Sequence, residues 1–368
     1  MEFIDLKTQY QKYKSDIDER IRKVIEHGKF IMGPEIFELE EKLADYTGAS
    51  HCISVSSGTE SLEIALRALE IGPGDEVITV PFTWISSVEV IGLIGAKPVF
   101  VDIDEKTYNI DVRQIEKAIT SRTKAIIAVG LFGQMPDLIS INQIADRHNI
   151  VVIEDGAQSF GATQNGVRSG AASAIGSTSF FPAKPLGCFG DGGALFTNDP
   201  ALADRMRAIR THGGLERHHH QYLGTNGRLD TLQAAILLAK LDYFEEEVRL
   251  RSSIGDRYNA LLQDHCKTPA TLPGNTHVYA QYTITIPNRD QVSESLKQSG
   301  VPTGIYYPKC VHEQPVFKDL GYFWGDFPIS EKVSRNVLSL PMHPFLNNSD
   351  QDKVVEALIE VLQKTNNE

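Results

Sequence analysis

Short β-rich runs alternate with helix-like segments over the first two thirds of this 368-residue chain, and this alternation limits the fold more than any other feature. Strands that alternate with helices predict a mostly parallel sheet with helices on both of its faces. The strand-like runs are 76–80, 97–103, 124–130, 150–155, 176–181 and 193–197, and the helix-like segments are 61–69, 85–94, 112–119, 139–148 and 201–209. Because such sheets bind ligands at the carboxyl ends of their strands, we expect functional residues directly after the strands.

The pattern changes in the last third of the chain. A helix is predicted over 229–244, and the charged stretch EEEVRLR follows it. The later elements are a strand over 279–286, a helix over 290–298, a strand over 303–308 and a helix over 350–363. We therefore predict an α/β protein with a large domain at 1–245 and a smaller C-terminal α+β domain at 246–368.

The composition excludes some classes of protein. A net charge of −12 argues against a nucleic-acid-binding protein, because phosphate contacts need clustered Lys and Arg. No apolar run approaches the roughly 18 residues of a membrane span, and MEFIDLKTQY lacks the features of a secretory leader. The four cysteines form no C-x-x-C pair, so we expect reduced thiols in a cytoplasmic protein.

An acidic and a basic residue follow two of the predicted strands. Asp155 ends the strand in VVIEDGAQSFG, and Lys184 lies in SFFPAKPLGCFGDGG just after the next strand. A carboxylate at the end of a buried strand is costly unless it meets a cation. A desolvated lysine has a lowered pKa and attacks carbonyl groups. The structural alternatives are that Asp155 caps a helix or forms a simple ion pair with Lys184.

Two further segments have the residues of a ligand site. In SVSSGTESLEIALRAL, the amides of Gly58 and Thr59 would hold an anion at the start of a helix, with Ser179 adding a hydroxyl. A plain helix cap is the alternative. In PFTWISS, Trp84 offers a flat face if it is exposed after its strand, and otherwise packs in the core.

A reactive lysine, a carboxylate, an aromatic face and an anion site are together what pyridoxal 5′-phosphate requires. In this interpretation the cofactor aldehyde forms a Schiff base with Lys184, and its phosphate lies at Gly58 and Thr59. Asp155 stays ionised and keeps the pyridine nitrogen protonated, which makes the ring an electron sink.

On these motifs the chain resembles the DegT/DnrJ/EryC1/StrS sugar aminotransferases, which are fold-type I, aspartate-aminotransferase-like enzymes dependent on pyridoxal phosphate. The most specific segments are SSGTESL, PFTWISS, DIDEKTYNID, IEDGAQSFGA, SFFPAKPLGCFGDGGA and GTNGRLDTLQAAIL. The resemblance implies that Lys184 also shuttles protons, that Asp155 pairs with the pyridine nitrogen and that Gln158 contacts the ring hydroxyl side. It further implies that Trp84 stacks on the cofactor, and that the phosphate site contains Gly58, Thr59 and Ser179.

The resemblance also implies a site shared between two subunits. Asn226 would reach the phosphate of the neighbouring subunit, and Arg228 would enter that same neighbouring site and face the substrate. A two-fold homodimer is then the minimum active unit. Tyr306 and Tyr307 in GIYYP would bind sugar hydroxyls or the diphosphate, or would simply pack the domain junction.

The implied activity is transfer of an amino group from glutamate to a nucleotide-linked ketosugar. The most similar branch acts at C3 of UDP-2-acetamido-2-deoxy-3-keto-glucuronic acid, for a bacterial surface polysaccharide such as the O-antigen of lipopolysaccharide. The alternatives are a dTDP-3-keto-6-deoxyhexose or 4-ketohexose substrate, another class of pyridoxal phosphate enzyme such as an amino-acid lyase, and a non-catalytic regulator that binds the cofactor. Relatives that remove a hydroxyl carry His at the lysine position, and Lys184 argues against that branch.

Other conspicuous motifs predict no additional site. In RHHHQ (217–221), three adjacent histidines cannot all face one ion, so no metal is expected and a loop near the substrate is the interpretation. Cys188 has no evident His/Asn set around it. GCFGDGG precedes a strand rather than a helix, which is not the pattern of a dinucleotide-binding loop.

Overall fold

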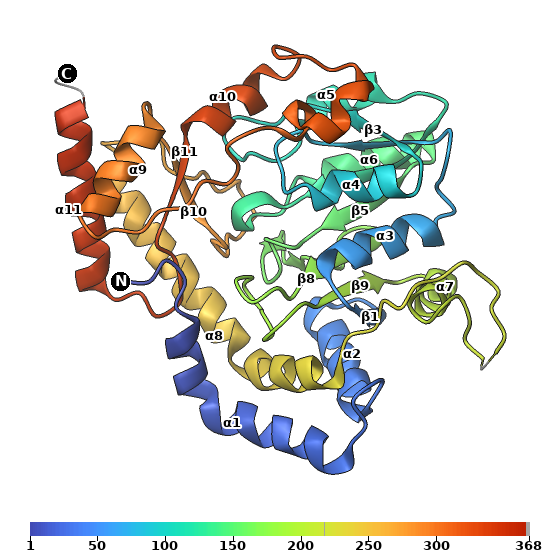
Figure 1. Ribbon diagram of the computed structural model, residues 1–368. Helices are drawn as coiled ribbons and strands as arrows, with labels where there is room; N and C mark the ends of the chain where they lie inside the picture. Colours follow the sequence, from blue (N-terminus) through green and yellow to red (C-terminus); the bar gives the residue numbers. More distant parts are fainter. Residues whose placement is uncertain (217, 366–368) are drawn as a thin grey trace.

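A seven-stranded sheet forms the centre of the larger part of the molecule (Figure 1). The structure is a computed structural model that describes residues 1–216 and 218–365. The strand order is β1-β9-β8-β5-β4-β2-β3, and only β9 runs antiparallel to its neighbours, β1 and β8. The strands are β1 (His51–Val55), β2 (Glu76–Thr79), β3 (Lys97–Phe100), β4 (Thr123–Val129), β5 (Val151–Asp155), β8 (Ile175–Ser179) and β9 (Gly193–Thr197). The predicted mostly parallel sheet is confirmed.

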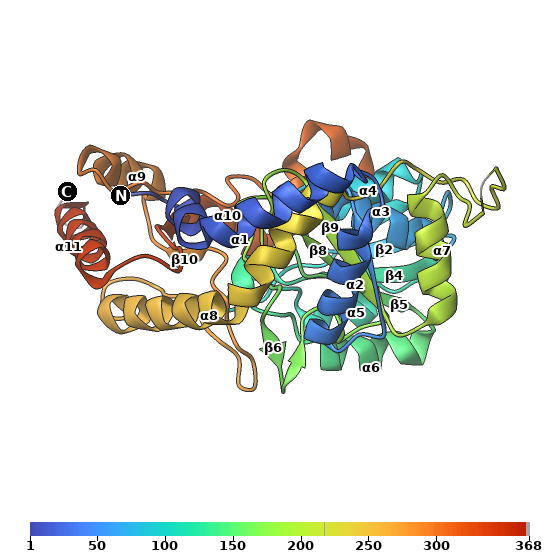
Figure 2. The same ribbon diagram turned by 90° about the horizontal axis from the view of Figure 1, so that it is seen from below.

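Helices cover both faces of this sheet, which is why strands such as β4 are almost continuously apolar and buried. Helices α3 and α4 lie on one face, and α5 and α6 lie on the other (Figure 2). The helices of this part are α1 (Leu6–His27), α2 (Pro34–Thr47), α3 (Gly58–Ala68), α4 (Ser86–Leu93), α5 (Val112–Ala118), α6 (Leu138–His148) and α7 (Pro200–Arg210). A short 3₁₀ turn, η1 (Leu131–Gly133), and a small hairpin of β6 (Thr163–Gln164) and β7 (Val167–Arg168) complete it.

Helix α8 (Thr231–Leu262) is the longest element and runs from the large sheet to the C-terminal part (Figure 1). The prediction ended this helix at residue 244, but the helix continues through the charged stretch. It does so because buried Phe244, Val248 and Tyr258 keep one side apolar while Glu246 faces solvent. The predicted boundary between residues 245 and 246 falls within this helix and stays a proposal.

The C-terminal part has its own core around a two-stranded antiparallel sheet. It contains β10 (Tyr282–Thr285), α9 (Arg289–Gln298), η2 (Val311–Glu313), η3 (Pro315–Leu320), α10 (Pro328–Asn336), β11 (Val337–Leu340) and α11 (Asn348–Thr365). The core includes Tyr258, Tyr282, Leu338 and Leu358. None of the described helices is both long enough and apolar enough to cross a membrane.

The predicted strand over 303–308 is wrong. Only Gly304 pairs with the small sheet, through an isolated bridge to Ser339. Beyond it the ring of Tyr306 packs on Phe3, whereas the hydroxyl of Tyr307 accepts a hydrogen bond from Gln158, which follows β5 of the large sheet. These two side chains therefore draw the backbone away from the sheet.

Candidate active site

The carboxyl ends of two neighbouring parallel strands bring Asp155 and Lys184 into one site. Asp155 is the last residue of β5 and lies opposite Ser177 of β8, and Lys184 follows β8 by five residues. Burial lowers the pKa of the Lys184 ammonium, and the Asp155 carboxylate opposes that shift. A lysine in this environment gives up its proton more easily than a solvated one, which makes its amine a better nucleophile.

Both carboxylate oxygens of Asp155 accept a hydrogen bond. The Ser87 hydroxyl donates to Oδ2 at 2.7 Å, and the Ala157 amide donates to Oδ1 at 3.2 Å. The segment after Asp155 forms turns rather than a helix, so the helix-cap alternative is wrong. A buried, acceptor-only side chain in this position is arranged to receive a proton donor from a ligand.

The start of α3 has the geometry that the predicted anion site requires, and its role stays a prediction. Ser57 caps the helix by accepting from the Glu60 amide at 3.0 Å, and by helix geometry the amides of Gly58 and Thr59 point out of its first turn. Ser179 lies directly against this turn. A Cβ on Gly58 would lie 2.6 Å from the Cβ of Ser179, so glycine is what allows the serine to approach the helix start.

Trp84 lies in the turn between β2 and α4 and is 54% exposed, which excludes the core alternative. The centroid of its ring lies 5.8 Å from that of Tyr307, at an interplanar angle of 39°. The flat face of an exposed tryptophan is thus available beside the rest of the site.

Gln158 connects the part of the molecule around the seven-stranded sheet to the C-terminal part. Its Oε1 accepts from the Phe132 amide at 2.9 Å, and its Nε2 donates to the Tyr307 hydroxyl at 3.1 Å. Burial raises the pKa of Tyr307, the hydrogen bond with Gln158 lowers it, and the Asp155 carboxylate raises it. Tyr306 instead lies at the junction with the N-terminal segment, where its pKa is raised by burial.

In the part of the chain that the structure describes, neither Asn226 nor Arg228 forms a hydrogen bond or ion pair with Lys184 or Asp155. Asn226 is exposed and its backbone pairs with Thr211. Arg228 lines an open cavity of about 480 Å³ together with Ser56, Ser57, Gly190, Asp191, Leu229, Asp230 and Gln233. Its Nε is buried, and no hydrogen-bond partner for it exists in the described part of the chain.

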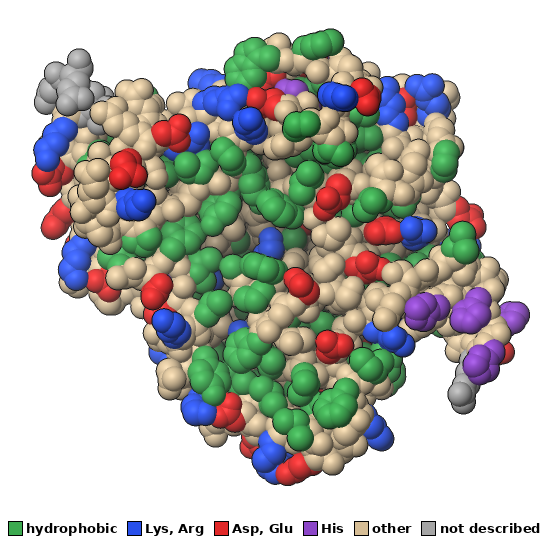
Figure 3. All heavy atoms as spheres, viewed as in Figure 1, with side chains coloured by type: hydrophobic (Ala, Val, Ile, Leu, Met, Phe, Trp, Pro, Cys, Tyr) green, Lys and Arg blue, Asp and Glu red, His purple; other side chains and the backbone are tan. Residues whose placement is uncertain are grey.

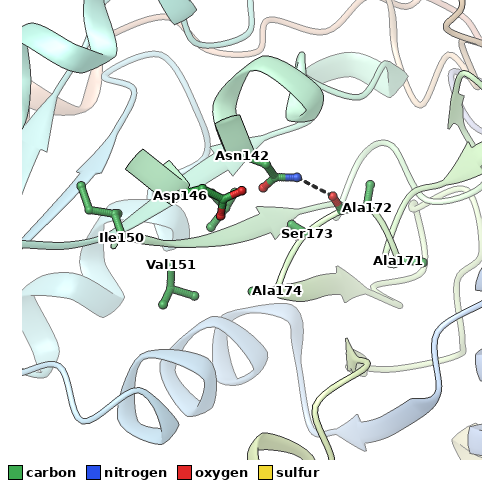
Figure 4. A pocket seen from close by; sticks show the side chains of 9 residues that line it. Asn142, Asp146, Ile150, Val151, Ala171, Ala172, Ser173 and Ala174 are labelled. Atoms are coloured by element: carbon green, nitrogen blue, oxygen red, sulfur yellow. Dashed lines mark hydrogen bonds between the residues drawn. The ribbon is translucent and has the colours of Figure 1, made fainter. Parts of the chain in front are cut away.

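A second cavity, of about 430 Å³, lies elsewhere on the molecule. Figure 4 shows two of the residues that line this cavity, Asn142 on α6 and Ala172. The Asn142 side chain donates a hydrogen bond of 2.8 Å to the Ala172 carbonyl. The cavity opens beside Val151, which begins β5, whereas Asp155 ends that strand. The cavity therefore lies at the amino ends of the parallel strands, whereas the candidate active site lies at their carboxyl ends. Its lining consists largely of alanine and aliphatic side chains.

The histidine-rich segment forms an exposed arm after α7, and Figure 3 shows its histidines gathered at one edge of the molecule. His220 Nδ1 lies 2.8 Å from the His212 carbonyl. Among residues 1–216 and 218–365, no three His, Cys, Asp or Glu side chains are close enough together to bind a metal ion. Arg217 of this motif lies outside the described residues.

Sequence reasoning missed two serines that connect the site. Ser86 Oγ lies 2.7 Å from the Thr59 hydroxyl, and Ser87 donates to Asp155. The start of α4 thus joins the anion site to the carboxylate. Both serines stand within PFTWISS at the start of α4, where a polar pair is also what a plain helix cap requires.

A family model described as the DegT/DnrJ/EryC1/StrS aminotransferase family matches residues 11–359. The chain belongs to this family. It is 51% identical, over 97% of its length and 99% of the relative's, to the UDP-2-acetamido-2-deoxy-3-oxo-D-glucuronate aminotransferase of Pseudomonas aeruginosa. It is 45% identical to the pleiotropic regulatory protein of Geobacillus stearothermophilus, over 97% of both chains.

A solved structure similar to this fold contains a form of the expected cofactor. The chain superposes with a TM-score of 0.90 on ntda from Bacillus subtilis with bound cofactor pmp, at 32% identity, covering 98% of this chain and 83% of that one. The aminotransferase class and the pyridoxal phosphate cofactor are confirmed. The residues present fit that cofactor, because the glycine-dependent helix start, the acceptor carboxylate, the exposed tryptophan face and the partly buried lysine supply the groups that it requires.

Proposed function

We propose that this protein transfers the amino group of glutamate to C3 of UDP-2-acetamido-2-deoxy-3-keto-glucuronic acid, as a step in the synthesis of a bacterial surface polysaccharide. The observation that carries this proposal is the 51% identity, over 97% of the chain, to the Pseudomonas aeruginosa enzyme named for that sugar. A cytoplasmic location is part of the proposal, and the four cysteines are free thiols.

Each residue of the site has a role in this proposal. When bound, pyridoxal phosphate supplies an aldehyde that carries the amino group and a ring that withdraws electrons. Lys184 would hold the aldehyde carbon through Nζ and move protons to and from the reacting carbon. Asp155 would hold the proton on the pyridine nitrogen, and Trp84 would cover the ring.

The remaining cofactor groups meet side chains that are already in position. Gly58, Thr59 and Ser179 would bind the phosphate through amides and hydroxyls, because the positive end of α3 favours an anion. Gln158 would face the ring hydroxyl with Tyr307 beside it. No metal ion has a role in this scheme.

The proposal includes a homodimer with shared sites. Asn226 is exposed, and the buried Nε of Arg228 lacks a partner in the described part of the chain, as expected if another subunit completes their surroundings. Phe30 and Ile31 are about half exposed, and their backbone contacts Thr231 and Asp230, close to Arg228 in sequence. Such apolar side chains are suited to burial against a second copy of the chain.

Substrate recognition in this proposal requires local positive charge in an acidic protein. The sugar carries a carboxylate and a diphosphate, while the chain has a net charge of −12. Arg228 of the neighbouring subunit would bind one of these anionic groups, because a guanidinium binds carboxylates and phosphates with paired hydrogen bonds. Tyr306 and Tyr307 would approach the sugar from the C-terminal part.

The test is to supply the 3-keto uronate with glutamate and to locate the new amine by NMR. Amination at C3 is expected, with faster turnover than for 6-deoxy or 4-keto sugars. Amination at C4, or a clear preference for a sugar without the carboxylate, would contradict the proposed substrate.

A regulator remains a second candidate, because a relative 45% identical is named as a regulatory protein. Adding glutamate without the sugar distinguishes a transaminase from a regulator by the absorption spectrum of the cofactor. A transaminase converts its cofactor to the pyridoxamine form, with a lasting change in the absorption spectrum, whereas a sensor leaves the spectrum unchanged.

A further inference from the structure

The loop that carries Lys184 folds back on itself. We define the lysine loop as residues 181–190. The chain leaves β8 at Phe180 and returns at Cys188, whose amide donates to the Phe180 carbonyl at 2.8 Å. The Lys184 amide donates to the Phe181 carbonyl at 2.9 Å. Pro182 and Pro185 on either side of Lys184 restrict the backbone further.

Helix α8 holds this loop at two points. Lys240 of α8 is only 3% exposed, and its Nζ donates to the Gly187 carbonyl at 2.6 Å. The same ammonium lies 4.7 Å from the centroid of the Phe189 ring. One face of α8 also presents Gln233, whose Oε1 accepts from the Phe189 amide at 2.9 Å. Gln233 and Lys240 are seven residues apart, which is two helical turns.

Packing alone does not account for a lysine at this position. Burying an ammonium is costly, and an apolar side chain of similar volume would fill the space at no electrostatic cost. Within the described part of the chain, Lys240 forms no ion pair within 4 Å. Buried Glu247 acts on it from the same helix, but both oxygens of that carboxylate already accept from Gln9 of α1, at 3.0 and 2.9 Å.

The specific partner of the ammonium is thus a backbone carbonyl three residues beyond Lys184. We propose that Lys240 is a positioning residue that fixes the lysine loop, and through it the Nζ of Lys184, relative to Asp155. This inference rests on the proposed role of Lys184 as the lysine that bonds the cofactor. A displacement of about 1 Å in a reacting group can lower a rate on the order of a hundredfold, so a small movement of the loop matters.

Titration of the ammonium is consistent with this environment. Burial lowers the pKa of Lys240 to about 8, while Glu247 of α8 and Cys188 of the loop oppose the shift. Lys240 is therefore largely protonated at neutral pH, and a charged donor makes a stronger hydrogen bond to the Gly187 carbonyl than a neutral one.

The test compares holoenzymes with Lys240 changed to Met or to Arg. Lys240→Met keeps an unbranched side chain that is one atom shorter and removes the donor, and the rate at which glutamate converts the absorption band of the lysine-bound cofactor is expected to fall about tenfold or more. The midpoint of the pH titration of that band is expected to move as well. Lys240→Arg keeps a charged donor and is expected to retain most of the wild-type rate.

Lys267→Met is the matched control. Lys267 Nζ also donates to a backbone carbonyl, that of Glu105 at 2.8 Å, but this lysine lies on an exposed surface. This variant is expected to leave both readouts at the wild-type values. Should Lys240→Met fail to fold, Lys240→Gln makes the same comparison, because its neutral amide carries no charge and lies one atom short of the position of the ammonium.

The outcomes separate this inference from the proposed function. Borohydride reduction followed by peptide mass spectrometry of the wild type is expected to place the cofactor on Lys184. A cofactor bound to another lysine would overturn the assignment of Lys184 and this inference with it. A cofactor on Lys184 together with wild-type rate and titration in folded Lys240→Met would overturn the role of Lys240 alone.

Discussion

Ser87→Ala perturbs the site locally, because it removes one hydrogen bond to Asp155 and one contact of 3.1 Å with the Thr83 hydroxyl. Ser87 is 1% exposed and its hydroxyl donates to Asp155 Oδ2 at 2.7 Å. After the substitution, the carboxylate keeps only the Ala157 amide, at 3.2 Å, among its hydrogen bonds in the described chain. The carboxylate is then less firmly oriented for the protonated pyridine nitrogen that we assign to it.

The expected magnitude follows from the kind of bond. A hydrogen bond to a charged group contributes about 1.5–3 kcal/mol. If the whole free energy of this hydrogen bond stabilises the transition state, its loss lowers kcat/KM between about tenfold and about 150-fold. The upper part of this range is expected, because the bond is short and buried.

A double-mutant cycle tests whether the effect acts through Asp155. Values of kcat/KM are measured for Ser87→Ala, Asp155→Asn and the double variant with glutamate and the ketosugar. Once Asp155 has lost its charge, the loss from Ser87→Ala should become small. An equal loss in both backgrounds would refute the reasoning, because Ser87 would then act independently of the carboxylate.

Ser330→Ala is the matched control for the cycle. Its buried hydroxyl donates to a second buried carboxylate, Asp102 Oδ1, at 2.6 Å at the start of α10. This substitution should lower the free energy of unfolding by an amount similar to Ser87→Ala and leave kcat/KM near the wild-type value. A comparable loss of activity would show that the assay reports general destabilisation.

Two further predictions concern the shared site and pH. Mixing inactive Lys184→Ala subunits with inactive Arg228→Ala subunits should restore one working site per heterodimer, and no activity in verified heterodimers would contradict the neighbouring-site role of Arg228. Since burial lowers the pKa of Lys240 to about 8 from 10.5, the unfolded chain binds more protons between these values, so this residue should make the protein more stable as pH rises through that window. Lys240→Met should remove about 3 kcal/mol of that rise in urea unfolding curves, and an unchanged pH dependence would contradict it.

Much of the part of the chain around the seven-stranded sheet was predictable because its elements carry periodic signals. The strand over 193–197 was placed at its observed bounds, and the other predicted strands of the sheet overlap the observed ones. Strand β1 was not predicted, although its five residues equal in number those of its partner β9. Helices α1 and α2 were also not predicted. Helix α1 packs along α8, where Tyr13 stacks on Tyr243 at 4.1 Å, a contact between segments more than 200 residues apart.

The candidate site was predictable as far as its residues follow strands or begin helices. Asp155 and Lys184 were identified because the ends of parallel strands meet at one edge of the sheet. Gly58 and Thr59 were identified because a helix start binds anions. Each inference needed only local pattern and one topological rule.

The supporting residues were not predictable by the same reasoning. Ser87 reaches Asp155 across 68 residues of sequence, and Lys240 reaches Gly187 across 53. A serine at a helix start and a lysine in a helix are ordinary in composition, so nothing local distinguishes them from a cap or a solvated charge. Only burial reveals their roles. A hydroxyl or ammonium removed from water must find a partner, and here each partner orients a residue that the sequence had already indicated.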